Sequence, residues 1–497
     1  MEFLQFLLYS IIISCILIYL SLRRIYSYWA ERGILHDKPK FFFGNFVEVG
    51  KTKSAYQILR EYYEKYKGKA KFVGIYFFLR RSILLIDLEL IKSVLIKDFD
   101  YFTGRGTYYN EKDDPLSANL VFVEGEKWRK SRAELNPCFT LGKLKSMFPA
   151  AIDVANQLVQ VIKEQQLSTS HQDIEIESLI NRYVIDLVGS IGFGLNCNSL
   201  KNPNAEFKKM VDKSFKLRHN LIIYASMYVF PNLSRKLGIT YYTDDVQKFF
   251  LRIVNETVKY REETGDQRND FMNLLIELRN SDKTGCLSIQ DITTHAFTLL
   301  TAGVETNTPA MSFCLYELAL NQDVQNKARA EINEVLTRYD GKLTYEGMNE
   351  LKYLQQVFNE SLRMHYVFPC TTRVCLKDYV IPKTNYIIER GTLVFVPIDA
   401  IYHDPEIYPN PEQFDPERFS VDEVKKRHPM AFLGFGDGPR ACIGKKFAIM
   451  QIVIGLVMIL QNYRILPTSK TPIPLQYKIN KLFAEAKDEI YLKLEEI

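Results

Sequence analysis

The sequence lacks the patterns that mark several common protein classes. Its 497 residues include eight cysteines but no C-x-x-C pair, so neither a zinc knuckle nor a thioredoxin-like motif is indicated. The net charge of +5 is too small to argue for nucleic acid, and no stripe of basic and aromatic residues accompanies it. Internal repeats and low-complexity linkers are also missing, which favours one large domain. Scattered single cysteines fit a reducing compartment.

A long uncharged run, Phe3–Leu22, opens the sequence. At ~20 residues it is long enough to cross a bilayer as a helix. Arg23 and Arg24 follow it and only Glu2 precedes it, so the positive-inside rule places the rest of the chain in the cytosol. A cleaved signal peptide is the alternative, but its basic first segment and its small-residue cleavage site are missing. We therefore expect an anchor at residues 1–22, a linker at 23–46 and one domain at 47–497.

Helical patterns dominate the rest of the chain. Two strands are expected at Phe72–Phe78 and Ser82–Asp87, joined by a charged turn at Arg80–Arg81, and further strands between Val374 and Val396. The longest predicted helix is Ser288–Leu320. The pattern predicts a fold that is mainly α with small β-sheets. Other helices are expected at Ser54–Tyr66, Lys127–Asn136, Leu144–Lys163, Ile176–Ile191, Thr243–Glu263, Asn269–Leu278, Asp323–Thr337 and Tyr353–His365.

The segment Phe435–Gly444, F-G-D-G-P-R-A-C-I-G, carries one cysteine in a glycine-rich loop ahead of a long apolar stretch, Phe447–Leu460. A thiolate at the start of a helix is favoured by the helix dipole and by backbone N–H groups. Glycine lets the backbone close tightly around it. The alternative is a buried structural cysteine beside a turn. The pattern makes Cys442 a candidate ligand for a soft metal centre.

The longest predicted helix contains A-G-V-E-T at Ala302–Thr306. A glycine inside a helix costs about 1 kcal/mol relative to alanine, and a flat ligand that approaches the backbone at Gly303 would offset that cost. Glu305 and Thr306 form an acid–hydroxyl pair, although Thr306 could equally bond the carbonyl four residues back. Pro309 removes one backbone donor and is expected to kink the helix.

Two pairs of side chains are spaced to share one helix face. Glu360 and Arg363 lie three residues apart in a helix that is otherwise apolar, so a buried ion pair is plausible, whereas most such pairs are exposed and contribute little. Trp128 and Arg132 lie one turn apart, and an indole N–H beside a guanidinium suits a carboxylate. For any single arginine the alternative is an ordinary surface charge.

Together these motifs resemble the cytochromes P-450. The haem-thiolate signature F-x-x-G-x-R-x-C-x-G matches at all five fixed positions. The motifs W-x-x-x-R, the oxygen groove (A/G)-G-x-(D/E)-T and E-x-x-R precede it in the order that the family shows. The segment Tyr101–Arg132 and the D-F-M-N-L-L run at Asp270–Leu275 are similar to insect family-six microsomal members. The resemblance implies one large haem-thiolate domain that binds haem b.

The resemblance also implies a role for each matching residue. Cys442 would be the axial ligand of the iron, and Thr306 and Glu305 would assist proton delivery to bound dioxygen. Glu360 and Arg363, with Arg418 of P-E-R-F, would be structural and needed for haem incorporation. The residues implied to bind the cofactor are Trp128, Arg132, Arg373 and Arg440 at the propionates, together with Phe435, Gly436, Gly444 and Ala302.

By the same resemblance, the protein would be a monooxygenase of the endoplasmic reticulum membrane that oxidises lipophilic foreign compounds such as plant toxins and insecticides. Electrons would come from NADPH through cytochrome P-450 reductase, with cytochrome b5 as a second donor. One endogenous lipid or hormone as substrate is the first alternative. A haem protein that sequesters ligands without turnover is the second, and the Glu305–Thr306 pair argues against it.

Two surfaces follow from this interpretation. One is a basic face formed by Lys127, Arg129, Lys130, Lys445 and Lys446. It would steer an acidic electron donor. The alternative is an ordinary solvated charged face. By analogy, substrate contacts are expected from Thr107–Phe122, Phe207–Thr243, Phe297–Val304, Val367–Thr371 and Leu482–Phe483.

Overall fold

The computed structural model describes every residue except 1, 169–172, 217–218, 220, 282–286 and 482. Helices form most of the described chain and three small sheets accompany them, so the predicted fold class is confirmed. The α-helices are α1 Glu2–Tyr26, α2 Tyr28–Glu31, α3 Ala55–Tyr66, α4 Leu88–Lys92, α5 Gly125–Leu135, α6 Leu141–Ser168, α7 Ile176–Val188, α8 Glu206–Ser214, α9 Leu221–Val229, α10 Pro231–Lys236, α11 Asp244–Thr264, α12 Phe271–Arg279, α13 Ile289–Leu320, α14 Gln322–Arg338, α15 Tyr345–Glu350, α16 Lys352–Met364, α17 Ile398–Tyr402, α18 Val421–Lys426 and α19 Lys445–Asn462. The strands are β1 Phe72–Phe77, β2 Arg80–Leu85, β3 Asp173–Glu175, β4 Thr371–Val374, β5 Tyr379–Val380, β6 Ile387–Ile388, β7 Leu393–Val396, β8 Tyr463–Pro467 and β9 Tyr491–Glu496.

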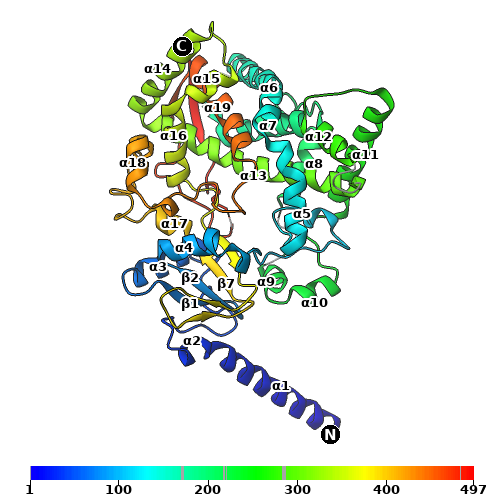
Figure 1. Ribbon diagram of the computed structural model, residues 1–497, viewed down its shortest axis with the longest axis vertical. Coiled ribbons are helices and arrows are strands. Elements are labelled where there is room, and N and C mark those ends of the chain that lie inside the picture. Colours follow the sequence, from blue (N-terminus) through cyan, green and yellow to red (C-terminus); the bar gives the residue numbers. More distant parts are fainter. Residues whose placement is uncertain (1, 169–172, 217–218, 220, 282–286, 482) are drawn as a thin grey trace.

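Helix α13 runs through the middle of the molecule (Figure 1). A capping box fixes its start, because the Ser288 hydroxyl accepts from the Asp291 N–H while the Asp291 carboxylate accepts from the Ser288 N–H. Most of α13 is buried in the larger hydrophobic core, which also contains apolar residues of α6, α7, α11 and α19. This central helix is therefore the frame on which the site is built.

A smaller core surrounds the four-stranded sheet, whose strand order is β1-β2-β7-β4. The pairing of Phe77 with Arg80 leaves Phe78 and Leu79 as a two-residue turn, and Phe78 takes a φ of 53°. The predicted turn at Arg80–Arg81 is wrong, because both arginines belong to β2. A tight hairpin needs a left-handed residue, and Phe78 supplies it although phenylalanine carries no sequence signal for that conformation.

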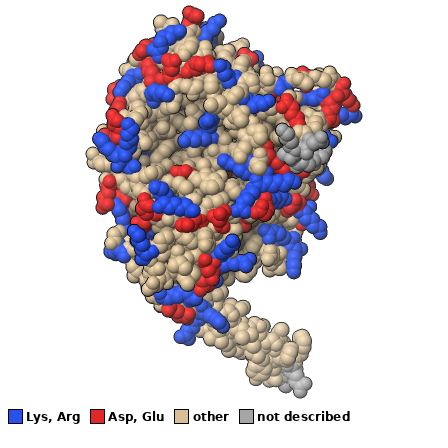
Figure 2. All heavy atoms as spheres, in the orientation of Figure 1, with Lys and Arg blue, Asp and Glu red and all other residues tan. Residues whose placement is uncertain are grey.

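Helix α1 projects away from the body and carries no charge along most of its length (Figures 1 and 2). The segment Phe3–Tyr26 has a mean hydropathy of 2.3 and none of its apolar window is buried, so its length and composition suffice to cross a membrane. Helix α19 passes the same test, but 61% of its window is buried in the core. After α1 the chain returns to the body, where the Trp29 indole donates to the Ile75 carbonyl at 3.1 Å.

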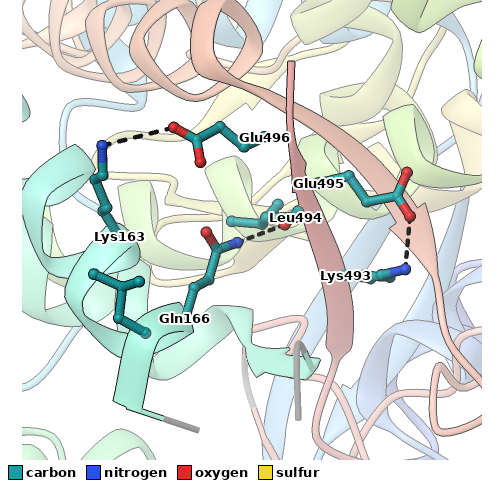
Figure 3. Close-up of a pocket in the computed structure, with 7 residues that line it drawn as sticks. Lys163, Gln166, Lys493, Leu494, Glu495 and Glu496 are labelled. Carbon is teal, nitrogen blue, oxygen red and sulfur yellow. Dashed lines mark hydrogen bonds and ion pairs between the residues drawn. The ribbon is translucent and has the colours of Figure 1, made fainter. Parts of the chain in front are cut away.

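The C-terminal strand β9 lies beside the end of α6 (Figure 3). The Gln166 side chain donates to the Leu494 carbonyl at 2.5 Å, and Lys163 Nζ lies 3.7 Å from Glu496. A cleft between the two elements is lined by these residues and their neighbours. None of the predicted site residues lines this cleft, so the chemistry lies elsewhere.

Candidate active site

The cysteine loop is held by hydrogen bonds of its own backbone. The Cys442 N–H donates to the Phe435 carbonyl at 2.8 Å, and the Ala441 N–H donates to the Gly438 carbonyl at 2.9 Å. Gly444 then caps α19. The loop therefore presents Cys442 just before the first turn of a buried helix, where the helix dipole favours a negative sulfur.

Two glycines give this loop its shape. Gly438 has a φ of 72°, and a Cβ there would lie 2.0 Å from the carbonyl oxygen of Leu95, so no side chain fits. Gly436 also has a positive φ, of 66°. Gly444 is different, because a Cβ there would meet only the Phe139 ring at 3.8 Å, an ordinary contact. Close approach of the backbone therefore requires glycine at Gly438, while Gly444 has space beside it.

The Cys442 side chain is exposed, yet burial raises its pKa. We infer from this combination that the thiol lines a space inside the protein. The Gly444 N–H and the positive charges of Arg105 and Arg132 act in the opposite direction and favour the thiolate. A partly desolvated thiol beside cations has the environment of a metal ligand.

Four guanidinium groups gather around this space without sufficient counter-charge. Burial, together with the charge of neighbouring arginines, lowers the pKa of Arg373 to about 9 and that of Arg440 to about 8. The carboxylate of Glu124 offsets only part of the charge on Arg440. Because a guanidinium stays protonated in proteins, the cluster has room for a further anion. The four are Arg105, Arg132, Arg373 and Arg440.

Helix α5 meets the cysteine loop through its predicted pair. Arg132 Nη1 donates to the Ala441 carbonyl at 3.0 Å. The Arg440 guanidinium lies 4.4 Å from the centre of the Trp128 ring, a cation–π contact, and Trp128 is buried. Arg440 also donates to three backbone carbonyls, those of Thr103, Leu120 and Val123. The structure therefore brings the predicted tryptophan and three of its predicted arginine partners to one wall.

Sequence reasoning missed Arg105. Its Nε is buried without a hydrogen-bond partner in the described chain, as is the Nε of Arg373. The Arg105 carbonyl accepts from the Thr372 hydroxyl at 2.8 Å, which holds it against β4 beside Arg373. The glycines on either side, Gly104 and Gly106, are the only local signal, and they do not reveal a partner so distant in sequence.

One turn of α13 is exposed although the rest of the helix around it is buried. In this turn Ala302 is exposed and Thr306 is half-buried. The Thr306 hydroxyl donates to the Ala302 carbonyl at 2.7 Å, so its oxygen remains available as an acceptor. A Cβ on Gly303 would lie 3.2 Å from a Val188 methyl group, which is a close contact. Packing of α7 on α13 therefore also favours a small residue here, and the approach of a flat ligand stays a prediction.

Glu305 is the acid of this turn. Burial raises its pKa to about 7, while the charge of Lys481 acts in the opposite direction. A carboxyl group with such a pKa exchanges protons near neutral pH. Helix α13 continues through Pro309 to its end at Leu320. Pro309 has no N–H for the carbonyl four residues earlier, which is that of Glu305, so this turn also lacks one helical hydrogen bond.

Glu360 and Arg363 form a fully buried pair in α16. The guanidinium donates to both carboxylate oxygens, at 2.7 and 2.8 Å, and neither side chain has any exposed area. Arg363 also donates to the carbonyls of Tyr402 and Pro411. Arg418 Nε lies 3.3 Å from Glu360. The three residues thus join α16 to the irregular segment that precedes the cysteine loop.

A comparison with protein families matches the model described as cytochrome P450 to residues 36–494. The chain belongs to the cytochrome P450 family. It is 41% identical over 506 residues to cytochrome P450 6A1 of Musca domestica, covering 100% of this chain and 99% of that protein. It is 42% identical over 511 residues to cytochrome P450 6a8 of Drosophila melanogaster, covering 99% and 100% of the two chains.

As a cytochrome P450, the protein is a monooxygenase, an oxidoreductase of a family that binds haem through a cysteine thiolate. Members generally use redox partners and lipophilic substrates. The residues present fit this cofactor, because an inward-facing thiol lies beside buried cations whose Nε atoms lack partners. Of the segments expected to contact substrate, residues 217–218, 220 and 482 lie outside the described part.

Proposed function

We propose that this cytochrome P450 binds haem with Cys442 as the axial ligand and inserts one atom of O2 into lipophilic substrates. The observation that supports this proposal is the arginine cluster, because a buried group of cations beside an inward-facing thiol suits a dianionic metal cofactor. Trp128, Arg132, Arg373 and Arg440 would bind the propionates, and we add Arg105 to them. When bound, haem supplies the oxygen chemistry, and its thiolate ligand favours O–O cleavage.

The protein's own contribution to turnover is proton delivery. Glu305, with a pKa of about 7, can take up a proton and release it within the physiological range. The Thr306 hydroxyl donates its proton in a hydrogen bond to the Ala302 carbonyl, and its oxygen can accept a hydrogen bond from a donor in the groove. We assign the passage of protons to this pair. Phe435, Gly436, Gly444 and Ala302 would pack around the cofactor.

We propose that α1 anchors the enzyme in the endoplasmic reticulum membrane, with residues 1–22 as the anchor, 23–46 as a linker and 47–497 as the catalytic domain. Electrons would come from NADPH through cytochrome P-450 reductase, with cytochrome b5 as a second donor. Ion pairs neutralise part of the predicted basic face, since Lys127 pairs with Glu111 and Arg129 pairs with Glu126. Lys445 and Lys446 remain exposed and are the stronger candidates for donor contacts.

Foreign lipophilic compounds such as plant toxins and insecticides are the proposed substrates. The test uses microsomes that contain the full-length protein and its reductase, with NADPH and a mixed library of allelochemicals, insecticides, fatty acids and insect hormones, read by mass spectrometry. Oxidation of several unrelated foreign compounds would support the proposal. Turnover of one endogenous lipid alone would transfer the protein to a biosynthetic role.

A pair of cysteine variants separates the cofactor from the fold. Cys442→Ser should abolish the ferrous–CO spectrum of a thiolate-bound haem and all turnover. Cys15→Ser is the matched control, because Cys15 is exposed on α1, away from the cysteine loop, and both properties should survive. Retention of the thiolate spectrum in Cys442→Ser would contradict the assignment.

A further inference from the structure

Two tyrosine hydroxyls lie side by side among the residues near α13. The Oη atoms of Tyr228, in α9, and Tyr241, in the loop before α11, are 3.4 Å apart. A normal O–H···O hydrogen bond is about 2.7–2.8 Å long, so the two hydroxyls hold each other only loosely. Neither has another hydrogen-bond partner in the described chain.

Both tyrosines face the interior. Burial raises the pKa of each phenol, although each residue keeps part of its surface exposed, which is the combination that Cys442 shows. The adjacent Tyr242 packs edge-on against Phe297 of α13 at 4.9 Å, and the charge of Glu305 acts on it. The loop that carries Tyr241 therefore lies against the stretch of α13 that carries the oxygen groove.

The two rings are fixed in place by separate neighbours. Arg80 Nη1 lies 3.5 Å from the Tyr228 carbonyl, and the Phe77 ring meets the Tyr228 ring edge-on at 6.2 Å. The Tyr241 ring packs on Phe122 at 5.4 Å and on Tyr108 at 5.8 Å. Because packing positions the rings, the hydroxyls keep their places whether or not they bond each other.

We propose that the hydroxyls of Tyr228 and Tyr241 bind an acceptor oxygen of the substrate, such as that of a ketone, ester, lactone or epoxide. Two donors 3.4 Å apart can both reach one oxygen at normal hydrogen-bond length. If one hydroxyl donates to the other instead, the pair still has one proton to give. Because the hydroxyls are buried, this hydrogen bond would favour a substrate with an acceptor oxygen over a hydrocarbon of the same shape. The hydrocarbon would leave the two hydroxyls with only their long contact to each other.

This inference rests on the proposed function and adds a substrate class to it. A neutral compound with an acceptor oxygen at one end would be held by the tyrosines, and its apolar remainder would lie toward Cys442. Oxidation is then expected on the part of the molecule remote from the acceptor oxygen. The hydroxyl pair thereby sets regiochemistry as well as affinity.

The test compares adamantanone with adamantane, which share one shape and differ by a carbonyl oxygen. Their affinities for the full-length holoenzyme are measured from the shift of the haem spectrum, with Tyr228→Phe, Tyr241→Phe and the double variant beside wild type. The matched control is Tyr491→Phe. It removes a hydroxyl that donates to the Glu489 carboxylate at 2.6 Å, and Tyr491 lies in β9, outside every segment expected to contact substrate.

We expect wild type and Tyr491→Phe to prefer the ketone by roughly threefold to tenfold, as one or two neutral hydrogen bonds provide. The Tyr228→Phe/Tyr241→Phe enzyme should lose this preference, because the buried carbonyl then has no donor, and should spread oxidation over more positions. Equal affinities in wild type, or a preference that survives in the double variant, would overturn the inference. Failure of the proposed function would be distinct, because the ligand-free spectrum would then lack a thiolate-bound haem.

Discussion

Replacing Arg373 by methionine should stabilise the haem-free protein while weakening its hold on haem. Arg373 is 2% exposed, and burial lowers its pKa by more than three units, to about 9. At about 1.4 kcal/mol per pKa unit, the buried charge costs up to about 5 kcal/mol in the absence of an anion. The lost hydrogen bond to the Thr372 carbonyl, 2.8 Å long, is worth about 1.5–3 kcal/mol because its donor is charged. We expect a net gain of about 2–3 kcal/mol in the free energy of unfolding.

The haem-bound protein should respond in the opposite direction. A charge-assisted hydrogen bond contributes about 1.5–3 kcal/mol, so haem affinity should fall by roughly tenfold to a hundredfold. Urea unfolding of the haem-free protein and the rate of haem transfer to apomyoglobin measure the two effects. Arg338→Met is the control, because Arg338 is 47% exposed and its loss should change neither quantity by more than about 1 kcal/mol. A haem-free Arg373→Met protein less stable than wild type would refute the counter-ion argument.

Three further substitutions test other parts of the site. Glu360→Gln leaves Arg363 buried without a counter-charge, so the free energy of unfolding should decrease by about 3–5 kcal/mol. The thermal midpoint should then fall by about 3–5 °C, and a decrease of less than about 1 °C would contradict this prediction. Gly438→Ala should abolish haem content measured by absorbance, whereas Gly391→Ala, with a φ of 88° and no atom within 4 Å, should lose only about 1 kcal/mol of stability to backbone strain. The folded protein holds the proton of Glu305 more tightly than the unfolded chain does, so this residue stabilises the fold at low pH, and the contribution is lost as the pH rises through about 7. Glu305→Gln does not titrate, so its stability relative to wild type should increase between pH 5 and 8. The same substitution should flatten the pH profile of product formed per NADPH.

Local spacing predicted the parts of the site that lie within one element. The i,i+3 spacing of Glu360 and Arg363 in an apolar helix predicted a buried pair, and their side chains are bonded in α16. The capping residues at Ser288 predicted the start of α13. The end of α7 was predicted less accurately, because α7 ends at Val188 and the last predicted residues belong to a separate π-helical turn at Gly189–Phe193. Periodicity cannot distinguish such a turn from regular helix.

Contacts between distant segments were beyond this reasoning. Arg105 has no local pattern, and its significance comes from Arg373 and Arg440, which β4 and the cysteine loop bring beside it. The sequence predicts that Gly303 gives space to a ligand, but it does not reveal the close contact of this glycine with Val188 in another helix. A sequence shows that a residue is small or charged, but the neighbour that requires it is set by packing.

The charges around the internal space explain why a neutral substrate is expected. With haem bound, four guanidinium groups would face two propionates and the Glu124 carboxylate, because ferric iron in the porphyrin would neutralise the Cys442 thiolate. One positive charge would then remain, but hydrogen-bond donors around it are already occupied, since Arg440 donates to three backbone carbonyls. A carboxylate would therefore lose its hydration without gaining direct partners. A neutral molecule avoids that cost, and the hydroxyls of Tyr228 and Tyr241 can still orient it through one acceptor oxygen. If the remaining positive charge decided binding instead, fatty-acid carboxylates would bind more tightly than their methyl esters. We expect the esters to bind more tightly, and spectral titration of one such pair decides between the two.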